Sequence, residues 1–345
     1  KKLAAAMGRP NVSAADAVLA GDVANQYVGY NPGPAGDVNG DGYDDVVFTG
    51  DYQNGSAWLV PGGPVAGTAF AETAVIEWRG VERMDQAGVG DFDGDGYDDL
   101  ATGSQAAAYL ILGSASPSGG WASSGIAYST SYNNGLSLAG GDVTGDGLDD
   151  LLVSNRAGTV WLVPGSAAPA SADIYTAGSQ FYSSAVGWAG HSLSARGDTD
   201  GDGLGDMLIS DPQDVDAGTL AGAVYLVAGS ATPSSTSLAT AGTKWTGLAG
   251  DYAGLSAAIV EDVNADGYAD VAVGAVQNDA AGDAAGAVYI LLGPTTSSGG
   301  PLSGADAIWT GELPGDYAGT SVSGAGDTDG DGFADFLVGA YGADS

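Results

Sequence analysis

The chain contains no cysteine and only one histidine in 345 residues. Without cysteine it can form neither disulfides nor thiolate metal sites, so oxygen ligands or closure of the fold must supply any cross-linking. The single His191 excludes a histidine pair or triad. Carboxylate, tyrosine or lysine chemistry remains open to an enzyme, but no recognisable acid pair occurs outside the repeated motif described below, so we predict no catalytic residues.

Basic residues are also scarce, because 8 Lys and Arg stand against 43 Asp and Glu, which gives a formal net charge of −35. A charge of this size repels nucleic acid and anionic membrane surfaces. The sequence has no apolar run of the length that a transmembrane helix needs. We therefore expect no nucleic-acid partner and no membrane insertion.

Glycine is abundant, with 60 residues, and 44% of the chain is hydrophobic, which predicts a globular, β-rich protein without long helices. The pattern D-x-(D/N/T)-x-D-G-x-x-D recurs six times at intervals of roughly 50 to 65 residues, a spacing typical of repeat architectures. The six copies occupy residues 37–45, 91–99, 142–150, 198–206, 262–270 and 327–335.

Short apolar segments flank each copy and predict two buried strands, as at 318–323 and 336–340 around the last copy. A third strand follows, with an aromatic residue four positions before a glycine, and a fourth strand carries another aromatic residue. The third-strand pairs are Trp58 with Gly62, Tyr109 with Gly113, Trp161 with Gly165, Tyr225 with Gly229 and Tyr289 with Gly293. The fourth-strand aromatics are Trp78, Tyr128, Tyr175, Trp245 and Trp309.

Four strands per repeat are the pattern of a propeller blade. Residues 15–21 align with residues 305–311, so the N-terminus should supply a fourth strand to the blade that the C-terminus begins. We therefore predict an all-β fold, a single β-propeller domain over residues 1–345. It should have six four-stranded antiparallel blades, with N- and C-terminal strands closing the ring in one blade.

Each copy of the motif can surround one hard cation such as Ca²⁺, which prefers six to eight oxygen ligands. Side chains at positions 1, 3, 5 and 9 and the carbonyl of position 7 are the expected ligands, and glycine at position 6 allows the bend. The predicted ligands are Asp37, Asn39, Asp41, Tyr43 and Asp45; Asp91, Asp93, Asp95, Tyr97 and Asp99; Asp142, Thr144, Asp146, Leu148 and Asp150; Asp198, Asp200, Asp202, Leu204 and Asp206; Asp262, Asn264, Asp266, Tyr268 and Asp270; and Asp327, Asp329, Asp331, Phe333 and Asp335.

An EF-hand is excluded because it needs a glutamate at position 12, where these copies have Phe48, Thr102, Val153, Ile209, Val273 and Val338. Simple solvated Asp-Gly turns would not need four fixed ligands per copy. We therefore predict about six Ca²⁺ ions per chain, with a structural role. Thr144 is the weakest position-3 ligand, so the third loop should bind its ion most loosely.

These residues resemble the FG-GAP repeat of the integrin α-subunit β-propeller. The resemblance rests on Ala253–Ser256 and Ala318–Ser321 in the first strand, the Asp-rich loops, Val273–Ala275 and Val338–Ala340 in the second strand, and Gly286–Tyr289 in the third. It implies calcium loops, extracellular recognition including adhesion, and a seven-bladed propeller as the alternative to six blades. Millimolar calcium is an extracellular condition, which also favours a secreted or cell-surface protein.

The face of the propeller opposite the metal loops is the natural place for a ligand, because the 2–3 and 4–1 connections lie there. Its longest loops run from residue 211 to 222 and from 275 to 286, and Trp188, Tyr252 and Tyr317 lie in its 4–1 turns. These three aromatics are weak candidates for ligand binding, since packing between blades would also explain them.

Three functions remain open at this point. The first is a calcium-stabilised module for adhesion or protein recognition, the second is a glycan-binding lectin, and the third is an enzyme that acts on polysaccharide at the second face. We favour them in that order, because no catalytic constellation is visible. The ligand and the oligomeric state are not determined by the sequence.

Overall fold

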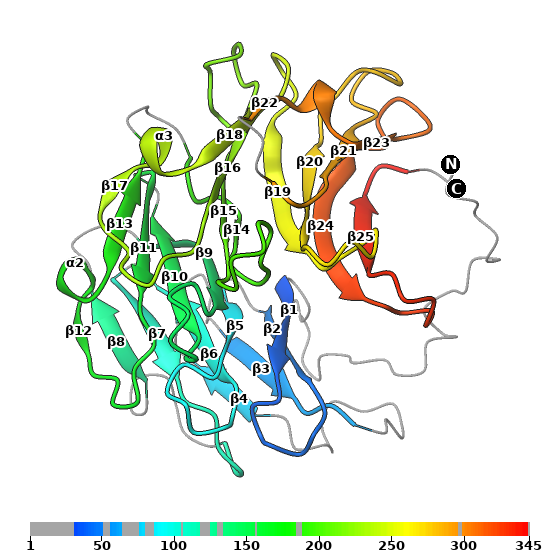
Figure 1. Cartoon of the computed structure of the whole chain (residues 1–345). Helices are drawn as coiled ribbons and strands as arrows, with labels where there is room; N and C mark the ends of the chain where they lie inside the picture. The colour runs from blue at the N-terminus through cyan, green and yellow to red at the C-terminus, as the bar shows by residue number, and fades with distance from the viewer. Residues whose placement is uncertain are drawn as a thin grey trace.

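The computed structural model describes residues 31–50, 56–63, 76–79, 86–104, 106–117, 125–129, 134–155, 157–183, 188–295 and 299–343. Within these ranges the chain is all-β apart from single helical turns, and successive sheets are arranged around a common centre (Figure 1). This arrangement is a β-propeller, as predicted. No helix in the described residues is long and apolar enough to cross a membrane.

Five sheets each contain four consecutive antiparallel strands from one repeat. The first has β1 (Asn31–Gly36), β2 (Asp45–Gly50), β3 (Ser56–Val60) and β4 (Ile76–Arg79). The second has β5 (Gln86–Gly90), β6 (Asp99–Gly103), β7 (Ala107–Ile111) and β8 (Ile126–Ser129). The third has β9 (Asn134–Gly141), β10 (Asp150–Asn155), β11 (Thr159–Val163) and β13 (Ser179–Tyr182). The fourth has β14 (Leu193–Ser194), β15 (Met207–Asp211), β16 (Ala223–Val227) and β18 (Thr243–Thr246), and the fifth has β19 (Ala253–Val260), β20 (Asp270–Ala275), β21 (Ala287–Leu291) and β23 (Ala307–Thr310).

The predicted blade count is wrong, because the described residues form five blades rather than six or seven. The last repeat contributes only a two-stranded ribbon, β24 (Ala318–Gly326) with β25 (Asp335–Ala340). Six copies of the loop motif therefore do not give six blades, since a loop needs only the two strands that it joins. The N-terminal strand predicted from residues 15–21 lies outside the described residues.

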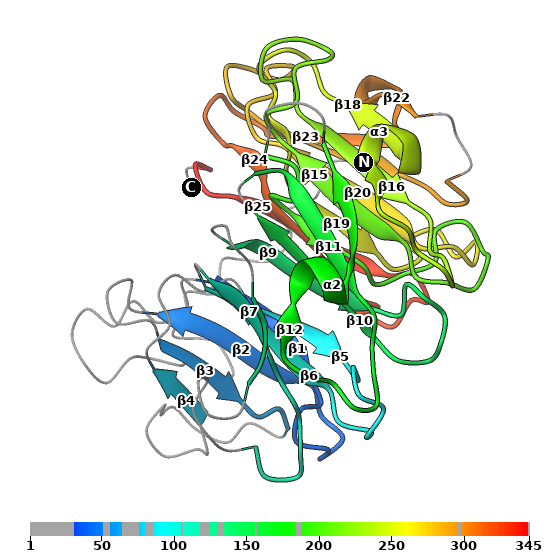
Figure 2. The same cartoon turned by 90° about the vertical axis from the view of Figure 1, so that its left-hand side faces the viewer.

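Three blades gain a short fifth strand from the following repeat, which the sequence did not predict. The additions are β12 (Ala172–Asp173) beside β8, β17 (Thr236–Ser237) beside β13 and β22 (Gly300–Pro301) beside β18, all parallel. A single helical turn follows each one: α2 (Ile174–Ala177), α3 (Leu238–Ala241) and η2 (Leu302–Gly304). Each turn lies at the outer rim, where Figure 2 shows α2 facing the viewer. These segments tie the outer edge of one blade to the next.

Hydrophobic side chains fill the spaces between neighbouring blades. One cluster joins Leu152 and Phe181 of the third blade to Ile209 and Tyr225 of the fourth. The predicted third-strand aromatics lie opposite position 12 of the loop motif in all five blades. These pairs are Phe48 with Trp58, Thr102 with Tyr109, Val153 with Trp161, Ile209 with Tyr225 and Val273 with Tyr289.

Four of the five predicted fourth-strand aromatics lie in fourth strands, and Tyr175 does not. Tyr175 belongs to α2, where it is exposed and contacts the edge of the Trp161 ring at a centroid distance of 5.3 Å. Phe181 takes the buried fourth-strand position in that blade. The fourth strand of this repeat was therefore predicted too early in the chain. The reason is that α2, like a fourth strand, has an aromatic residue after a Ser/Ala-rich connection.

Candidate metal sites

All six Asp-rich loops join the first and second strands of their repeats, as the sequence predicted. Hydrogen bonds link successive loops, which places them together on one face of the propeller. The loop backbones bend through glycines with positive φ, such as Gly96 at φ 89° and Gly203 at φ 88° in position 6. An L side chain rarely adopts this conformation, so glycine fits the position.

The position-1 aspartate organises each loop from within. Its carboxylate accepts the N–H of the position-6 glycine in all six loops, at 2.7 to 3.0 Å. In loop two, Asp91 also accepts the N–H groups of Gly94 and Asp95 at 2.7 and 3.0 Å. These hydrogen bonds within the protein are sufficient to fold the loop around one carboxylate, and they do not involve a metal ion.

The position-9 aspartate lies at the start of the second strand, and its carboxylate forms hydrogen bonds to the start of the loop and to the end of the third strand. One oxygen accepts the N–H of position 2 in all six loops, at 2.8 to 3.2 Å. In the five blades, the other oxygen accepts the N–H of the glycine that follows the third strand, at 2.8 to 2.9 Å. Those glycines are Gly62, Gly113, Gly165, Gly229 and Gly293. The recurring third-strand glycine is thereby explained, since a Cβ at Gly113 would lie 2.4 Å from the Asp98 carbonyl oxygen.

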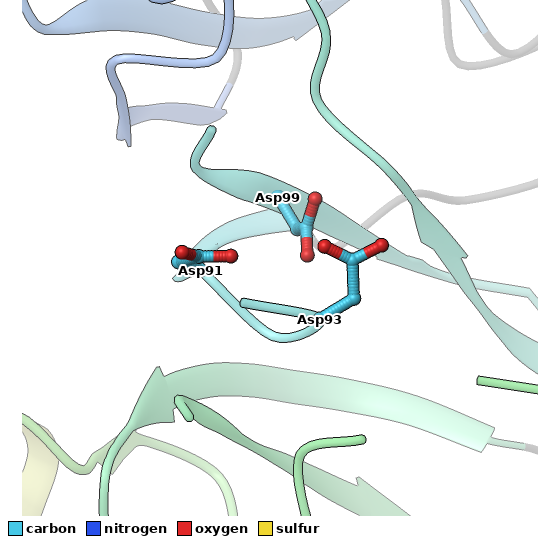
Figure 3. Close-up of side chains that lie close together, drawn as sticks. All are labelled: Asp91, Asp93 and Asp99. Carbon is cyan, nitrogen blue, oxygen red and sulfur yellow. The ribbon is translucent and has the colours of Figure 1, made fainter. Parts of the chain in front are cut away.

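Three loops bring the carboxylates of positions 1, 3 and 9 together. The ligand atoms within each group lie within 4.8 Å of one another, and Figure 3 shows the group in loop two. The groups are Asp91, Asp93 and Asp99; Asp198, Asp200 and Asp206; and Asp327, Asp329 and Asp335. Three carboxylates converging at this distance fit the ligand set of a hard divalent cation.

The other three loops have Asn39, Thr144 and Asn264 at position 3, which are uncharged. The Asn39 amide donates to both Asp45 oxygens at 3.3 and 3.4 Å, and the Thr144 hydroxyl donates to Asp150 at 3.3 Å. The Asn264 amide donates to Asp266 at 2.9 Å instead. These loops could still offer oxygens at position 3, but with one carboxylate fewer. Weakest binding at the Thr144 loop stays a prediction.

The position-5 aspartates are not among these three-residue groups, and their role as metal ligands stays a prediction. Their carboxylates accept the N–H of position 7 in every loop, at 2.9 to 3.1 Å. Position 7, chosen from the sequence for its carbonyl group, also packs through its side chain. A Cβ at the position-4 glycine Gly40 would lie 2.4 Å from the Tyr97 ring, and one at Gly145 would lie 2.1 Å from the Leu204 side chain. Position 7 of one loop therefore covers position 4 of the preceding loop.

In the five blades, burial raises the pKa of the position-9 carboxyls, so they are costly to ionise without a cation nearby. In the last repeat, hydrogen bonds from Thr328 instead lower the pKa of Asp335. Burial raises the pKa of Asp99 to about 7, and the neighbouring Asp93 and Asp95 carboxylates push the pKa in the same direction. Burial likewise raises the pKa of Asp150 to about 6. A divalent cation in the loop would favour the ionised carboxylates, so the charge of such an ion fits the site.

Each loop is also held by the blade that follows it. The position-8 N–H of one loop donates to the position-1 carbonyl of the loop before it at all five junctions, at 2.9 to 3.2 Å. At two junctions the position-8 side chain adds a bond, because Asp98 accepts the N–H of Asp37 at 2.7 Å and Asp149 accepts that of Asp91 at 2.9 Å. The sequence analysis missed position 8, although its aspartates adjoin the recognised motif.

A residue one or two positions after the third-strand glycine adds a further link at four junctions, Thr295 being the one that lies two positions after its glycine. The donors are Ser114, Ser166, Ser230 and Thr295, whose N–H groups bond the position-2 carbonyls of Val38, Phe92, Val143 and Thr199 at 2.9 to 3.0 Å. The candidate metal sites thus lie directly at the contacts between blades. An ion that orders one loop would also order a surface on which the next blade packs.

On the opposite face, the structure does not join the three predicted aromatics in one contact group among the described ring contacts. Trp188 is 43% exposed and stacks on His191 at a centroid distance of 5.7 Å, whereas Tyr317 stacks on Tyr341 at 4.8 Å. Tyr252 and Tyr317 have positive φ values of 52° and 55°. Their role in ligand binding stays a prediction.

The sequence analysis also missed a partly buried polar network in the fourth blade. The Lys244 ammonium bonds Asp214 at 2.7 Å and Asp216 at 2.6 Å, and the Tyr225 hydroxyl donates to Asp214 at 3.2 Å. Asp211 is fully buried nearby and accepts the N–H groups of Trp188 and Gln213 with one oxygen. Its other oxygen has no hydrogen-bond partner among the residues that the structure describes. These contacts hold the loop over residues 211–222 in place.

Comparisons with known proteins agree with the repeat pattern. Residues 91–153 match the FG-GAP-like repeat family, and residues 253–291 match the FG-GAP repeat family. Integrin alpha-4 of Xenopus laevis is 34% identical over 159 residues, covering 43% of this chain and 15% of that protein. Integrin alpha-PS2 of Drosophila melanogaster is 36% identical over 174 residues, covering 45% of this chain and 12% of that protein.

The chain thus spans less than a sixth of the length of these curated relatives. Among solved structures, BBS1N in complex with ARL6DN, soaked with lead, aligns with a TM-score of 0.48 and 12% identity. That alignment covers 88% of this chain and 73% of the other.

Proposed function

Because this chain carries FG-GAP repeats similar to those of integrin alpha subunits, we propose that it is an extracellular protein-recognition module whose loops bind Ca²⁺. The observation that carries the proposal is the convergence of positions 1, 3 and 9 in three loops that are hydrogen-bonded to the loops of neighbouring repeats. Calcium at these sites would stabilise the propeller, while the opposite face would bind the partner. We propose no catalytic role.

Calcium rather than magnesium is the proposed ion, because the loops offer flexible rings of carboxylate and backbone oxygens and no fixed octahedral cage. Up to about six ions would bind each chain, with the three all-aspartate loops binding most tightly. Ions that bind only the folded state stabilise it by mass action. A cell-surface or secreted location follows from the same argument, since millimolar calcium fills sites of modest affinity.

The experiment is thermal unfolding with calcium and after chelation, followed by elemental analysis of the desalted protein. We expect chelation to lower the melting temperature and several calcium ions per chain to be retained. Re-addition of magnesium at the same concentration serves as the control and should restore less stability. An unchanged melting temperature together with no retained metal would contradict the calcium proposal.

The recognition proposal is tested separately with extracellular proteins immobilised on a surface. Trp188→Ala should weaken binding, because Trp188 is 43% exposed on the proposed recognition face. Tyr43→Ala is the matched control, since Tyr43 is 50% exposed but lies in a metal loop on the other face. Equal binding by both variants would contradict use of the Trp188 surface. Exposed aromatics also bind sugars, so a glycan array with hits that depend on Trp188 would favour the lectin alternative.

A further inference from the structure

The first metal loop differs from most of the others in the hydrogen bonding of its position-4 backbone N–H. In the second, third, fourth and sixth loops this N–H donates to the position-1 carboxylate, at 2.6 to 2.8 Å. In the first loop Asp37 accepts the N–H groups of Asp41 and Gly42, but no described residue accepts the N–H of Gly40. Gly40 is also exposed to solvent. The nitrogen that follows Asn39 is thus held by no hydrogen bond within the described part of the chain.

Asn39 and Gly40 form a dipeptide in which the side-chain amide can react with the next backbone nitrogen. Glycine favours this reaction because it has no Cβ to hinder the approach of its nitrogen. Packing keeps a glycine at this position, since a Cβ at Gly40 would lie 2.4 Å from the Tyr97 ring of the following loop. The structure therefore maintains a reactive pair inside a metal loop.

We propose that Asn39 is a site of self-modification, at which deamidation converts the side-chain amide to a carboxylate. The Gly40 nitrogen attacks Cγ of Asn39 and forms an N–Cγ bond, while the Cγ–Nδ2 bond breaks and ammonia leaves with the Gly40 proton. Water then opens the cyclic imide. Attack at Cγ gives aspartate at this position, and attack at the backbone carbonyl gives isoaspartate. The net change is uptake of water and loss of ammonia, so solvent is the only co-reactant.

The aspartate product would give the first loop the same carboxylate set as the three converging loops. At present the Asn39 amide donates to both oxygens of Asp45. A carboxylate in its place would lose these bonds and repel Asp45, so a cation would be needed to hold the two side chains together. The reaction would turn a loop that closes through its own hydrogen bonds into one that depends on a bound ion. This consequence, unlike the modification itself, rests on the proposed calcium function.

Asn264 provides a matched comparison within the same chain. It occupies position 3 of the fifth loop, but Ala265 follows it, and the Ala265 N–H interacts with the Asp262 carboxylate. Both the methyl group of Ala265 and this interaction oppose attack on the Asn264 amide. Of the other two Asn-Gly pairs, 54–55 lies outside the described residues, and Asn134–Gly135 lies in β9, whose pairing with β10 holds the backbone extended.

The test is incubation of the full chain after chelation, in isotope-labelled water at mildly alkaline pH, followed by peptide mapping with mass spectrometry. We expect Asn39 to lose ammonia and take up labelled oxygen about tenfold faster than Asn264, because only Asn39 precedes a glycine. Asn39→Gln is the control and should keep its amide, since its longer side chain would have to close a larger ring. Equal rates at Asn39 and Asn264, or no conversion of Asn39, would overturn the proposal. This readout needs no metal, so it stands or falls separately from the calcium proposal.

Asn39→Asp represents the aspartate product and tests the consequence for the loop. Calcium should raise the melting temperature of this variant by more than it raises that of the freshly purified wild type. Wild type that has been incubated until Asn39 is converted should respond like the variant. A response of Asn39→Asp no larger than that of the wild type would contradict the gain in metal dependence, and so would conversion of Asn39 to isoaspartate alone.

Discussion

At the scale of the residue, the position-9 aspartates join parts of each blade that are distant in sequence. Asp99 receives the N–H of Phe92 from its own loop and the N–H of Gly113 from the end of the third strand. Because Asp99 is fully buried, loss of its carboxylate would leave the Gly113 N–H without this acceptor, while the Phe92 N–H would keep only its bond to the Gly90 carbonyl at 3.0 Å. The aspartate therefore has a structural role in addition to any role as a metal ligand.

Asp99→Ala should consequently destabilise the protein even when no metal is bound. We expect a loss of about 2 kcal/mol in the free energy of unfolding, from the buried Gly113 N–H left unpaired and one of the two bonds of the Phe92 N–H removed. Asp95→Ala is the matched control in the same loop, since the Asp95 carboxylate accepts the N–H of Tyr97 in an exposed hydrogen bond. Urea unfolding in the presence of chelator measures both variants. Similar losses would show that the two aspartates differ only as metal ligands.

Asp211 predicts a pH dependence that is separate from the loops. Burial raises its pKa, the nearby Asp214 carboxylate raises it further, and the Trp188 and Gln213 N–H groups and Lys244 oppose the shift. The folded state thus holds the Asp211 proton more tightly than the unfolded state, whose pKa is about 3.9. The stability contribution of this group is fully present below the unfolded pKa and is lost as pH rises through the folded pKa.

Asp211→Asn removes this titration while keeping an oxygen for the two N–H donors. Relative to the wild type, the variant should therefore gain stability between about pH 4 and about pH 8. Urea unfolding at both pH values gives the difference. The exposed Asp283→Asn serves as the control and should show little change in the same comparison. A constant difference between Asp211→Asn and wild type across this range would contradict the shifted pKa.

At the scale of the element, the sequence predicted what is local and missed what depends on a neighbouring blade. The loop motif identified the turns between first and second strands, and the aromatic-to-glycine spacing identified the third strands. The parallel strands β12, β17 and β22 could not be foreseen, because each pairs with a strand of the preceding repeat. Two-residue strands also carry no periodicity that a sequence pattern can reveal.

For the candidate metal sites too, the sequence predicted the contacts within one loop better than the contacts between loops. Positions 1, 3 and 9 converge in the loops that have aspartate at all three, as expected from oxygen-rich spacing. The position-5 carboxylate accepts the N–H of position 7, a bond that the sequence did not predict, and its role as a metal ligand stays a prediction. The position-8 aspartates Asp98 and Asp149 act on the preceding loop, so inspection of one motif copy could not identify their partner.

At the scale of the whole molecule, the net charge of −35 should make stability depend on salt. After chelation the loop carboxylates repel one another, and added NaCl screens that repulsion. The melting temperature of the chelated protein should therefore rise with NaCl. The calcium-loaded protein is the control and should respond less, because bound ions already neutralise part of the charge. An equal or larger response in the loaded protein would contradict this account.

The hydrogen bonds between successive loops all run in one direction, because the later blade always donates to the carbonyl of the earlier one. The row of loops consequently has a direction, from carbonyl acceptors in the earlier loop to N–H donors in the later one. Each of the first five loops accepts an N–H from the loop that follows it. The loop over residues 327–335 donates the Ala334 N–H to the preceding loop. Its first seven residues are correspondingly exposed. A loop that lost its order would therefore withdraw its N–H donor from the loop before it, so that a local disturbance would pass backwards along the chain.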